Sequence, residues 1–155
     1  MKGEAIMEAR EIRRDELDQL LEFYDLHLWD VKDDPLPDRN IVEDTWDAII
    51  ESHNHAALGV FDKGGLMASC SIAVIPNLTR GCRPYALIEH IATHRQNRRK
   101  GYASAMLEFA SDYARERGCY KVMFMTGHLS EKIKKFCHSV GFESGVKNAY
   151  IKRWK

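Results

Sequence analysis

Residues 85–110 read YALIEHIATHRQNRRKGYASAMLEFA, and the pattern of side chains changes twice along this stretch. The run YALIEHIAT predicts a β-strand, because it is apolar, short and followed by a turn. Alternation along such a strand would place Leu87, Glu89, Ile91 and Thr93 on one face. From Gly101 onward the apolar residues recur at helical spacing, which predicts an amphipathic helix. A strand that leads through a short loop into a helix is where open α/β sheets bind ligands.

The rest of the chain predicts a mixed α/β (α+β) domain. The apolar residues recur at helical spacing both before and after two predicted strands, which favours helices in those segments. The two strands are joined by a tight turn, which predicts an antiparallel hairpin. The predicted order is a strand, two helices, three strands, a helix, a strand, a helix and a strand. The segments are a helix over 15–28, a helix from 38 to about 50, the strands HAALGVF and LMASCSIAVI, a helix from 101 to about 118, the strand YKVMFM, a helix that Gly141 ends, and the strand AYIKRW.

Composition limits the classes of partner. The 155 residues suit one domain over 1–155, and the 23 basic residues equal the 23 acidic ones, so general electrostatics favours neither nucleic acid nor an anionic membrane. No apolar run approaches the roughly 20 residues of a transmembrane helix. The four cysteines form no CxxC pair, and the first residues are acidic where a signal peptide would be apolar. We therefore expect a cytoplasmic protein with reduced thiols. The histidine pairs His53-x-His55 and His90-x-x-x-His94 do not have a spacing typical of zinc ligands, so we expect no metal.

The turn between the strand and the helix carries four cations in six positions, from Arg95 to Lys100. A helix N-terminus offers unpaired N–H groups and the positive end of a dipole, and Gly101 lets an anion approach that backbone. The turn therefore indicates a phosphate or pyrophosphate site, with a solvated basic loop as the alternative. The sequence contains neither GxxxxGK[ST] nor GxGxxG, which argues against a P-loop nucleotidase or a dinucleotide-binding dehydrogenase.

The segment RRKGYA, residues 98–103, resembles the Q/R-x-x-G-x-G/A signature of the GNAT superfamily of acetyl-CoA-dependent N-acetyltransferases. The similarity extends over IEHIATH, YKVMFM and KKFCHSVGF, and so over residues 84–142; the order of these segments is similar to that of the glucosamine-6-phosphate N-acetyltransferases. The resemblance implies a GNAT fold, with a mostly antiparallel mixed sheet of about six to seven strands flanked by about four helices. Its cosubstrate would be acetyl-CoA.

The resemblance also assigns coenzyme A contacts residue by residue. The loop and the first turn of the helix would hold the pyrophosphate on backbone amides, and the end of the preceding strand would bind the pantetheine arm. Two further positions lie in the segment that resembles the family's FYxxxGF element and just before it. The implied contacts are Arg98, Arg99, Lys100, Gly101, Tyr102, Ala103 and Ser104 for the pyrophosphate, Ile91, Ala92 and Thr93 for the arm, and Ser130 and Phe136 beyond them.

Acetyl transfer to an amine needs a group that takes the amine's proton. Glu89 is the expected base, because partial burial in an apolar strand would raise its pKa; an ion-paired or surface Glu is the alternative. His90 is the other candidate base, although alternation would turn it to the opposite face. Cys137 stands where the family often has a Tyr that protonates the leaving thiolate, so either it is the acid or it is a buried thiol. In that second case water, Tyr113 or Tyr150 would serve.

The function expected from these features is N-acetylation of a primary amine on a small molecule such as an amino sugar, an amino acid or a polyamine-like compound. The missing Tyr at Cys137 leaves open a catalytically idle acyl-CoA-binding module, and acetylation of protein lysines or N-termini is a third alternative. The acidic segment 29–34 either attracts a cationic amine or is a solvated loop. We also expect AYIKRW to support a homodimer.

Overall fold

The computed structural model describes residues 7–28, 35–128 and 130–154. These residues form one five-stranded sheet in the order β1-β2-β3-β4-β5, in which the first four strands are antiparallel neighbours and β5 runs parallel to β4. The α/β class is confirmed, whereas the predicted six to seven strands are too many for the described part of the chain. The strands are β1 (Glu8–Glu11), β2 (His55–Asp62), β3 (Gly65–Ile75), β4 (Tyr85–Thr93) and β5 (Val122–Phe124).

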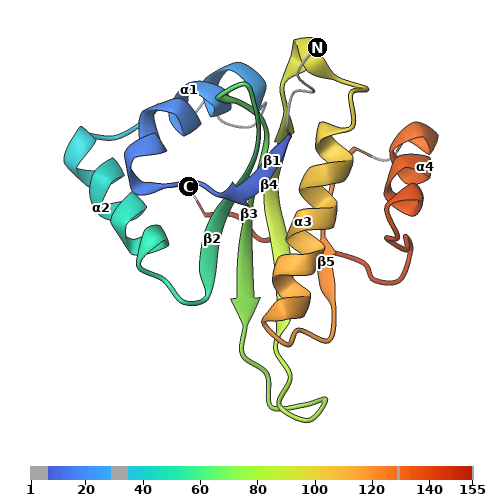
Figure 1. Cartoon of the computed structure of the whole chain (residues 1–155). Helices are drawn as coiled ribbons and strands as arrows, with labels where there is room; N and C mark the ends of the chain where they lie inside the picture. Colours follow the sequence, from blue (N-terminus) through green and yellow to red (C-terminus); the bar gives the residue numbers. More distant parts are fainter. Residues whose placement is uncertain (1–6, 29–34, 129, 155) are drawn as a thin grey trace.

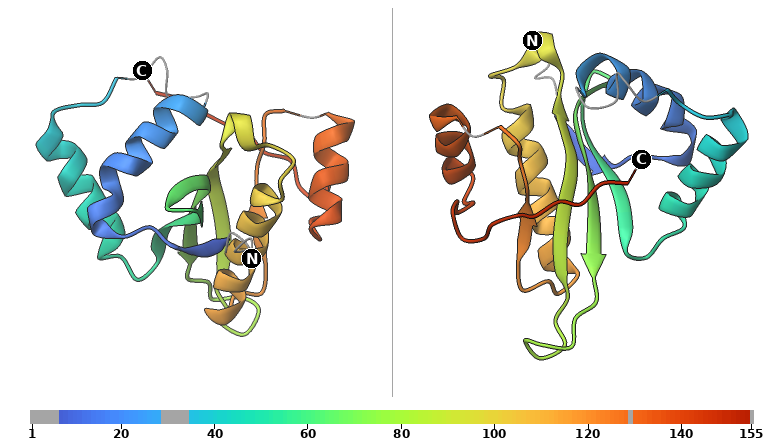
Figure 2. Two further views of the ribbon diagram at one scale, coloured as in Figure 1. Left: turned by 45° about the horizontal axis from the view of Figure 1, so that its top comes forward. Right: turned by 180° about the vertical axis from the view of Figure 1, so that it is seen from behind.

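The segment AYIKRW accounts for one of the missing strands. Residues 149–154 are irregular, with Tyr150 94% and Trp154 82% exposed. In Figure 2 this segment runs across the sheet instead of along an edge of it. Bulky and β-branched residues form a strand only where a neighbouring strand pairs with them, and none of the five described strands does so here. The prediction of a final strand is therefore wrong for this chain taken alone.

Within the described ranges four α-helices flank the sheet, as predicted. Helices α1 (Leu17–His27) and α2 (Arg39–Ile50) lie against one face, which we call the α1/α2 face. Helix α3 (Tyr102–Glu116) packs on the opposite face, the α3 face, and α4 (Glu131–Ser139) stands beyond α3 at the β5 edge (Figure 1). The loop from β4 to α3 contains a short 3-10 turn, η3 (Arg95–Asn97).

The hairpin of β2 and β3 forms where the sequence predicted it. Lys63 and Gly64 adopt left-handed backbone angles, with φ of 51° and 80°, and Asp62 pairs with Gly65 across them. Two successive residues of positive φ give a turn whose twist matches that of antiparallel strands. The turn sets the pairing of Phe61 with Leu66, and beyond it the register shifts by one residue, so that Val60 pairs with Ala68. From Ala68 onward alternate residues of β3 reach opposite faces.

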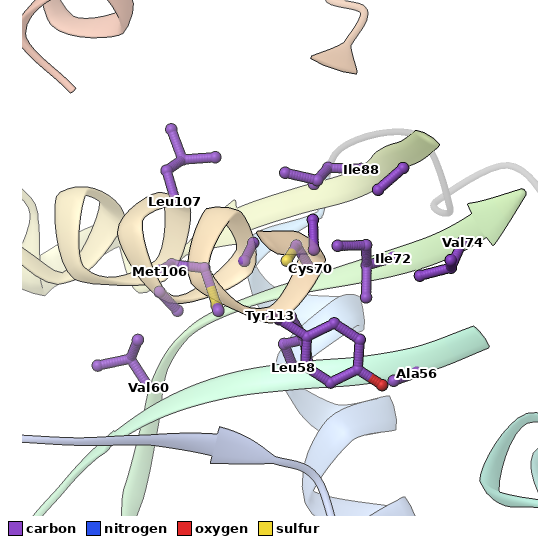
Figure 3. Packing of buried hydrophobic residues seen from close by; sticks show 14 of the residues in the cluster. Ala56, Leu58, Val60, Cys70, Ile72, Val74, Ile88, Met106, Leu107 and Tyr113 are labelled. Atoms are coloured by element: carbon purple, nitrogen blue, oxygen red, sulfur yellow. The ribbon is translucent and has the colours of Figure 1, made fainter. Parts of the chain in front are cut away.

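The larger core lies between α3 and the sheet. Leu58, Ile72, Ile88, Met106 and Leu107 are each at most 1% exposed and interlock there (Figure 3). Burial of side chains of this size contributes about 1.5–3 kcal/mol each. The apolar stripe predicted for α3 therefore packs on the sheet. This packing holds the start of α3, and the loop before it, next to β4.

A bulge in β4 changes which face its last residues meet. Ser69 pairs with Ala92 and Ser71 with Glu89, so one residue of β3 lies opposite His90 and Ile91. His90 takes a left-handed backbone angle, φ 54°. Beyond the bulge Ile91 packs into the α3-face core and Ala92 into the α1/α2-face core. The expectation that Glu89 and Ile91 share a face is wrong, because an extra residue reverses the alternation.

Candidate functional site

Strands β4 and β5 separate at the same place as the bulge. Strand β5 pairs only with Ala86, Leu87 and Ile88, so among the described strands the outer edge of β4 from Glu89 to Thr93 has no partner. Backbone N–H and C=O groups along such an edge are free to bind an extended ligand. The predicted pantetheine contacts Ile91, Ala92 and Thr93 lie along this open edge.

The basic loop leads from this edge to the N-terminus of α3. Arg98, Arg99, Lys100 and Gly101 are exposed, and Gly101 is the N-cap residue with φ 86°. A Cβ placed on Gly101 would meet no described heavy atom within 4 Å, so space is open in front of the helix. The first N–H groups of a helix have no partner within it and carry the positive end of its dipole. The loop therefore has the room and the donors that a pyrophosphate needs.

The side chain of Tyr102 has a positioning role that the sequence did not predict. It is only 6% exposed, and its hydroxyl donates a hydrogen bond of 2.5 Å to Oδ2 of Asp62 at the end of β2. Only the backbone of Tyr102 is then directed to a ligand, and with Ala103 and Ser104, both half-buried, it forms the first turn of α3. Nothing local in the sequence links positions 62 and 102, so this contact could not be predicted from it.

A pair of histidines joins α1 to the start of the same loop. His27 is buried, its ring lies 4.3 Å from that of His94, and its Nδ1 accepts the Arg95 N–H at 3.3 Å. Burial first, and then the neighbouring His94 and arginines, lower the pKa of His27. His27 is therefore neutral near pH 7, which suits an acceptor of a backbone hydrogen bond beside a basic loop.

The two candidate bases lie together on the α1/α2 face. Paired residues of antiparallel strands point to the same side, so Glu89 shares a face with its partner Ser71. A hydrogen bond of 2.8 Å joins Ser71 Oγ to His90 Nδ1. His90 is thus turned toward the same face as Glu89, and the expectation that it faces away is wrong because it occupies the bulge.

The other predicted residues lie on or before α4. Ser130 caps this helix, since its Oγ accepts the Ile133 N–H at 3.2 Å. Phe136 packs against the α3-face core. Cys137 is buried at 9% exposure, and burial raises the pKa of its thiol. A raised pKa makes a thiol harder to deprotonate. The geometry accordingly agrees with the alternative of a buried thiol, and the acid role of Cys137 stays a prediction.

Several expectations fall outside this site. The acidic segment 29–34 lies outside the described residues. A pocket of about 610 Å³, lined in part by His53, Asn77 and Arg117, opens at the other end of β3 and includes none of the predicted site residues. Within the described ranges, no three His, Cys, Asp or Glu side chains gather as metal ligands would. No helix in those ranges is long and apolar enough to cross a membrane.

Comparison with known proteins identifies the family. The model of the acetyltransferase (GNAT) family matches residues 14–142, which include the bulged strand, the basic loop and α4. The chain belongs to the GNAT family of acetyltransferases, which use acetyl-CoA. The resemblance noted in residues 84–142 is thereby confirmed at the level of the family.

Individual relatives agree with this membership. A glucosamine 6-phosphate N-acetyltransferase of Trypanosoma brucei brucei is 31% identical over 81 residues, which are 52% of this chain and 53% of that protein. The match thus spans about half the length of that relative. An Agrobacterium tumefaciens str. C58 protein assigned as an acetyltransferase has a TM-score of 0.82 and 27% identity, covering 94% of this chain and 99% of its own. An aminoglycoside N-acetyltransferase in complex with CoA shares the fold, with a TM-score of 0.78 and 16% identity. The match covers 99% of this chain and 98% of that one.

Proposed function

We propose that this protein transfers the acetyl group of acetyl-CoA to a primary amine on a small molecule, such as an amino sugar, an amino acid or a polyamine-like compound. The observation that carries the proposal is the open edge of β4, which begins at the bulge and leads directly to the exposed N-terminus of α3. An extended chain ending in a pyrophosphate matches both parts. The similarity to a glucosamine 6-phosphate N-acetyltransferase and to an aminoglycoside N-acetyltransferase supports an amine acceptor.

Binding of acetyl-CoA follows from the groups along this path. The pyrophosphate accepts hydrogen bonds from the backbone amides of Gly101 to Ser104, and the cations of Arg98, Arg99 and Lys100 add attraction. The pantetheine arm follows the backbone of Ile91, Ala92 and Thr93 in place of a neighbouring strand. This arrangement brings the thioester to the bulge, where Glu89 lies.

The chemistry then needs a proton acceptor beside the thioester. Glu89 takes the proton that the amine releases as it attacks the carbonyl carbon, directly or through one water. Its half-buried position on the α1/α2 face keeps its carboxylate accessible to an acceptor on that face. Cys137 is the proposed donor of a proton to the departing thiolate, with water as the alternative.

A thiol-release assay over a panel of small amines tests this proposal. We expect turnover of at least one amino sugar, amino acid or polyamine, with one coenzyme A thiol released for each amide formed. Tight coenzyme A binding by calorimetry with no turnover of any amine would contradict the proposal and indicate an acyl-CoA-binding module. Turnover of peptides alone would contradict the small acceptor.

We further propose that the protein forms a homodimer through residues 149–154. Tyr150, Ile151 and Trp154 are 94%, 69% and 82% exposed, which is unusual for a cluster of large apolar side chains. Light scattering on the full chain should give twice the mass of one chain. A monomer at concentrations of tens of micromolar would contradict this part of the proposal and leave the acetyl transfer unaffected.

A further inference from the structure

The bulge of β4 holds a hydrogen-bonded serine and histidine whose roles the expected mechanism leaves unassigned. His90 has φ 54°, a backbone angle that few residues other than glycine adopt. Ser71 Oγ lies 2.8 Å from its Nδ1. The bulge also lies where β5 leaves β4, beside the proposed path of the thioester. Strained residues of this kind concentrate at functional sites.

The hydrogen bonds of Ser71 indicate which nitrogen of His90 carries the proton. The backbone oxygen of Glu89 lies 3.3 Å from Ser71 Oγ, and a carbonyl oxygen can only accept a hydrogen bond. When the Ser71 hydroxyl donates to this oxygen, it can only accept in its bond of 2.8 Å to His90, and Nδ1 of His90 is then the donor. Neutral imidazole has one protonated nitrogen, which leaves Nε2 of His90 with a free lone pair. Ser71 therefore prepares His90 to accept a proton at Nε2.

A second histidine lies on the same face. His55 pairs with Ala73, two residues along β3 from Ser71, so the side chains of His55 and Ser71 point to the same side. Burial first, and then the nearby His90, lower the pKa of His55. Among the described residues, the titratable groups on this part of the face are His55 on β2, Glu89 on β4 and Tyr24, which packs against the α1/α2-face core from α1.

We propose that His90, oriented by Ser71, removes the proton that an acceptor ammonium must lose before it can attack. This inference rests on the proposed acetyl transfer and gives the two bases separate roles. The ammonium gives one proton to Nε2 of His90; the free amine then forms the N–C bond while the C–S bond breaks and its electron pair stays on sulfur. Glu89 takes the second proton from nitrogen. One of the two protons ends on the coenzyme A thiolate, and the other returns to water.

The pH dependence of kcat/KM separates the two bases. We expect His90→Asn to lose roughly tenfold or more in kcat/KM at a pH two units below the pKa of the acceptor amine. Above that pKa the amine is already free, so the variant should come within about threefold of the wild type, since the second proton transfer is intact. Asparagine suits the test because it tolerates positive φ and does not titrate. Glu89→Gln should remain slow at every pH.

Ser71 is a positioning residue in this scheme, and a matched pair of variants tests it. Ser71→Ala should lower kcat/KM only at low pH, as His90→Asn does, but by a few fold. Ser71→Thr keeps the hydroxyl and should match the wild type. Melting temperature and coenzyme A affinity verify that each variant is folded. If His90→Asn does not fold, the Ser71 pair decides the question.

Two results would overturn the assignment. One is a wild-type rate for His90→Asn at low pH, and the other is a loss that is the same at all pH values. If the wild type acetylates no amine, the proposed function fails and the assignment fails with it. An active wild type with an unaffected His90→Asn removes only the assignment.

Discussion

Gly101→Glu should abolish coenzyme A binding, with a loss of affinity of at least about 100-fold, because like charges brought together cost several kcal/mol. Gly101 is the N-cap residue of α3, and no described atom lies within 4 Å of the position that its Cβ would occupy. A glutamate there would place its carboxylate in the space proposed for the pyrophosphate. Calorimetric titration with coenzyme A measures the effect.

The other end of the same helix provides the matched control. Gly118 follows α3, has φ 77° and also has no described heavy atom within 4 Å of its Cβ position. Gly118→Glu therefore introduces the same charge and a similar backbone strain, which costs about 1–2 kcal/mol for a residue in the left-handed region. We expect its coenzyme A affinity to equal that of the wild type. Equal affinities of all three proteins would refute the pyrophosphate site at the start of α3.

Glu89→Gln should lower kcat by about 10²–10⁴-fold, the range expected when a general base is removed. Glutamine keeps nearly the same shape but accepts no proton at the pH of the assay. The residue lies at the last regular position of β4 before the bulge, and its backbone oxygen already holds Ser71. The substitution leaves this backbone contact in place, so the shape of the β4 edge proposed for the pantetheine arm should be kept. The affinity for coenzyme A should therefore not change. Steady-state rates with the best amine of the panel provide the measurement.

An exposed glutamate on α3 serves as the control for this substitution. Glu108→Gln changes the same functional group on the solvent side of the helix, and it should leave kcat unchanged. If Glu89→Gln turns over every accepted amine as fast as Glu108→Gln does, Glu89 is not the base. A loss confined to low pH would instead indicate that Glu89 acts on the amine before attack, the role proposed for His90.

Local patterns in the sequence were sufficient for most of the fold. The apolar stripe of α3, from Met106 to Ala114, predicted a helix that is buried on that side. The residues DKGG, 62–65, have the composition of a hairpin turn, and the structure gives Lys63 and Gly64 the positive φ that a two-residue turn requires. The basic loop was identified from Gly101 and the strand and helix on either side of it. Each of these signals lies within a few neighbouring residues.

The site could not be predicted as fully, because its geometry depends on pairing between distant residues. Strand alternation assigned Glu89 and His90 to opposite faces, and a single extra residue opposite Cys70 reversed that assignment. The bulge has no signature in YALIEHIAT, which contains no glycine. The contact of Tyr102 with Asp62 joins residues 40 positions apart. Only the register of β2, β3 and β4 together reveals such contacts.

The early end of β5 has a consequence for the protein in solution. From Glu89 to Thr93 the outer edge of β4 has no partner among the described strands, and an open edge of this kind recruits strands from other molecules and promotes aggregation. A pantetheine arm lying along those residues would occupy the same edge. Bound acyl-CoA would then take the place of a neighbouring strand and protect the edge. The protein without acyl-CoA would be more prone to self-association during storage and concentration.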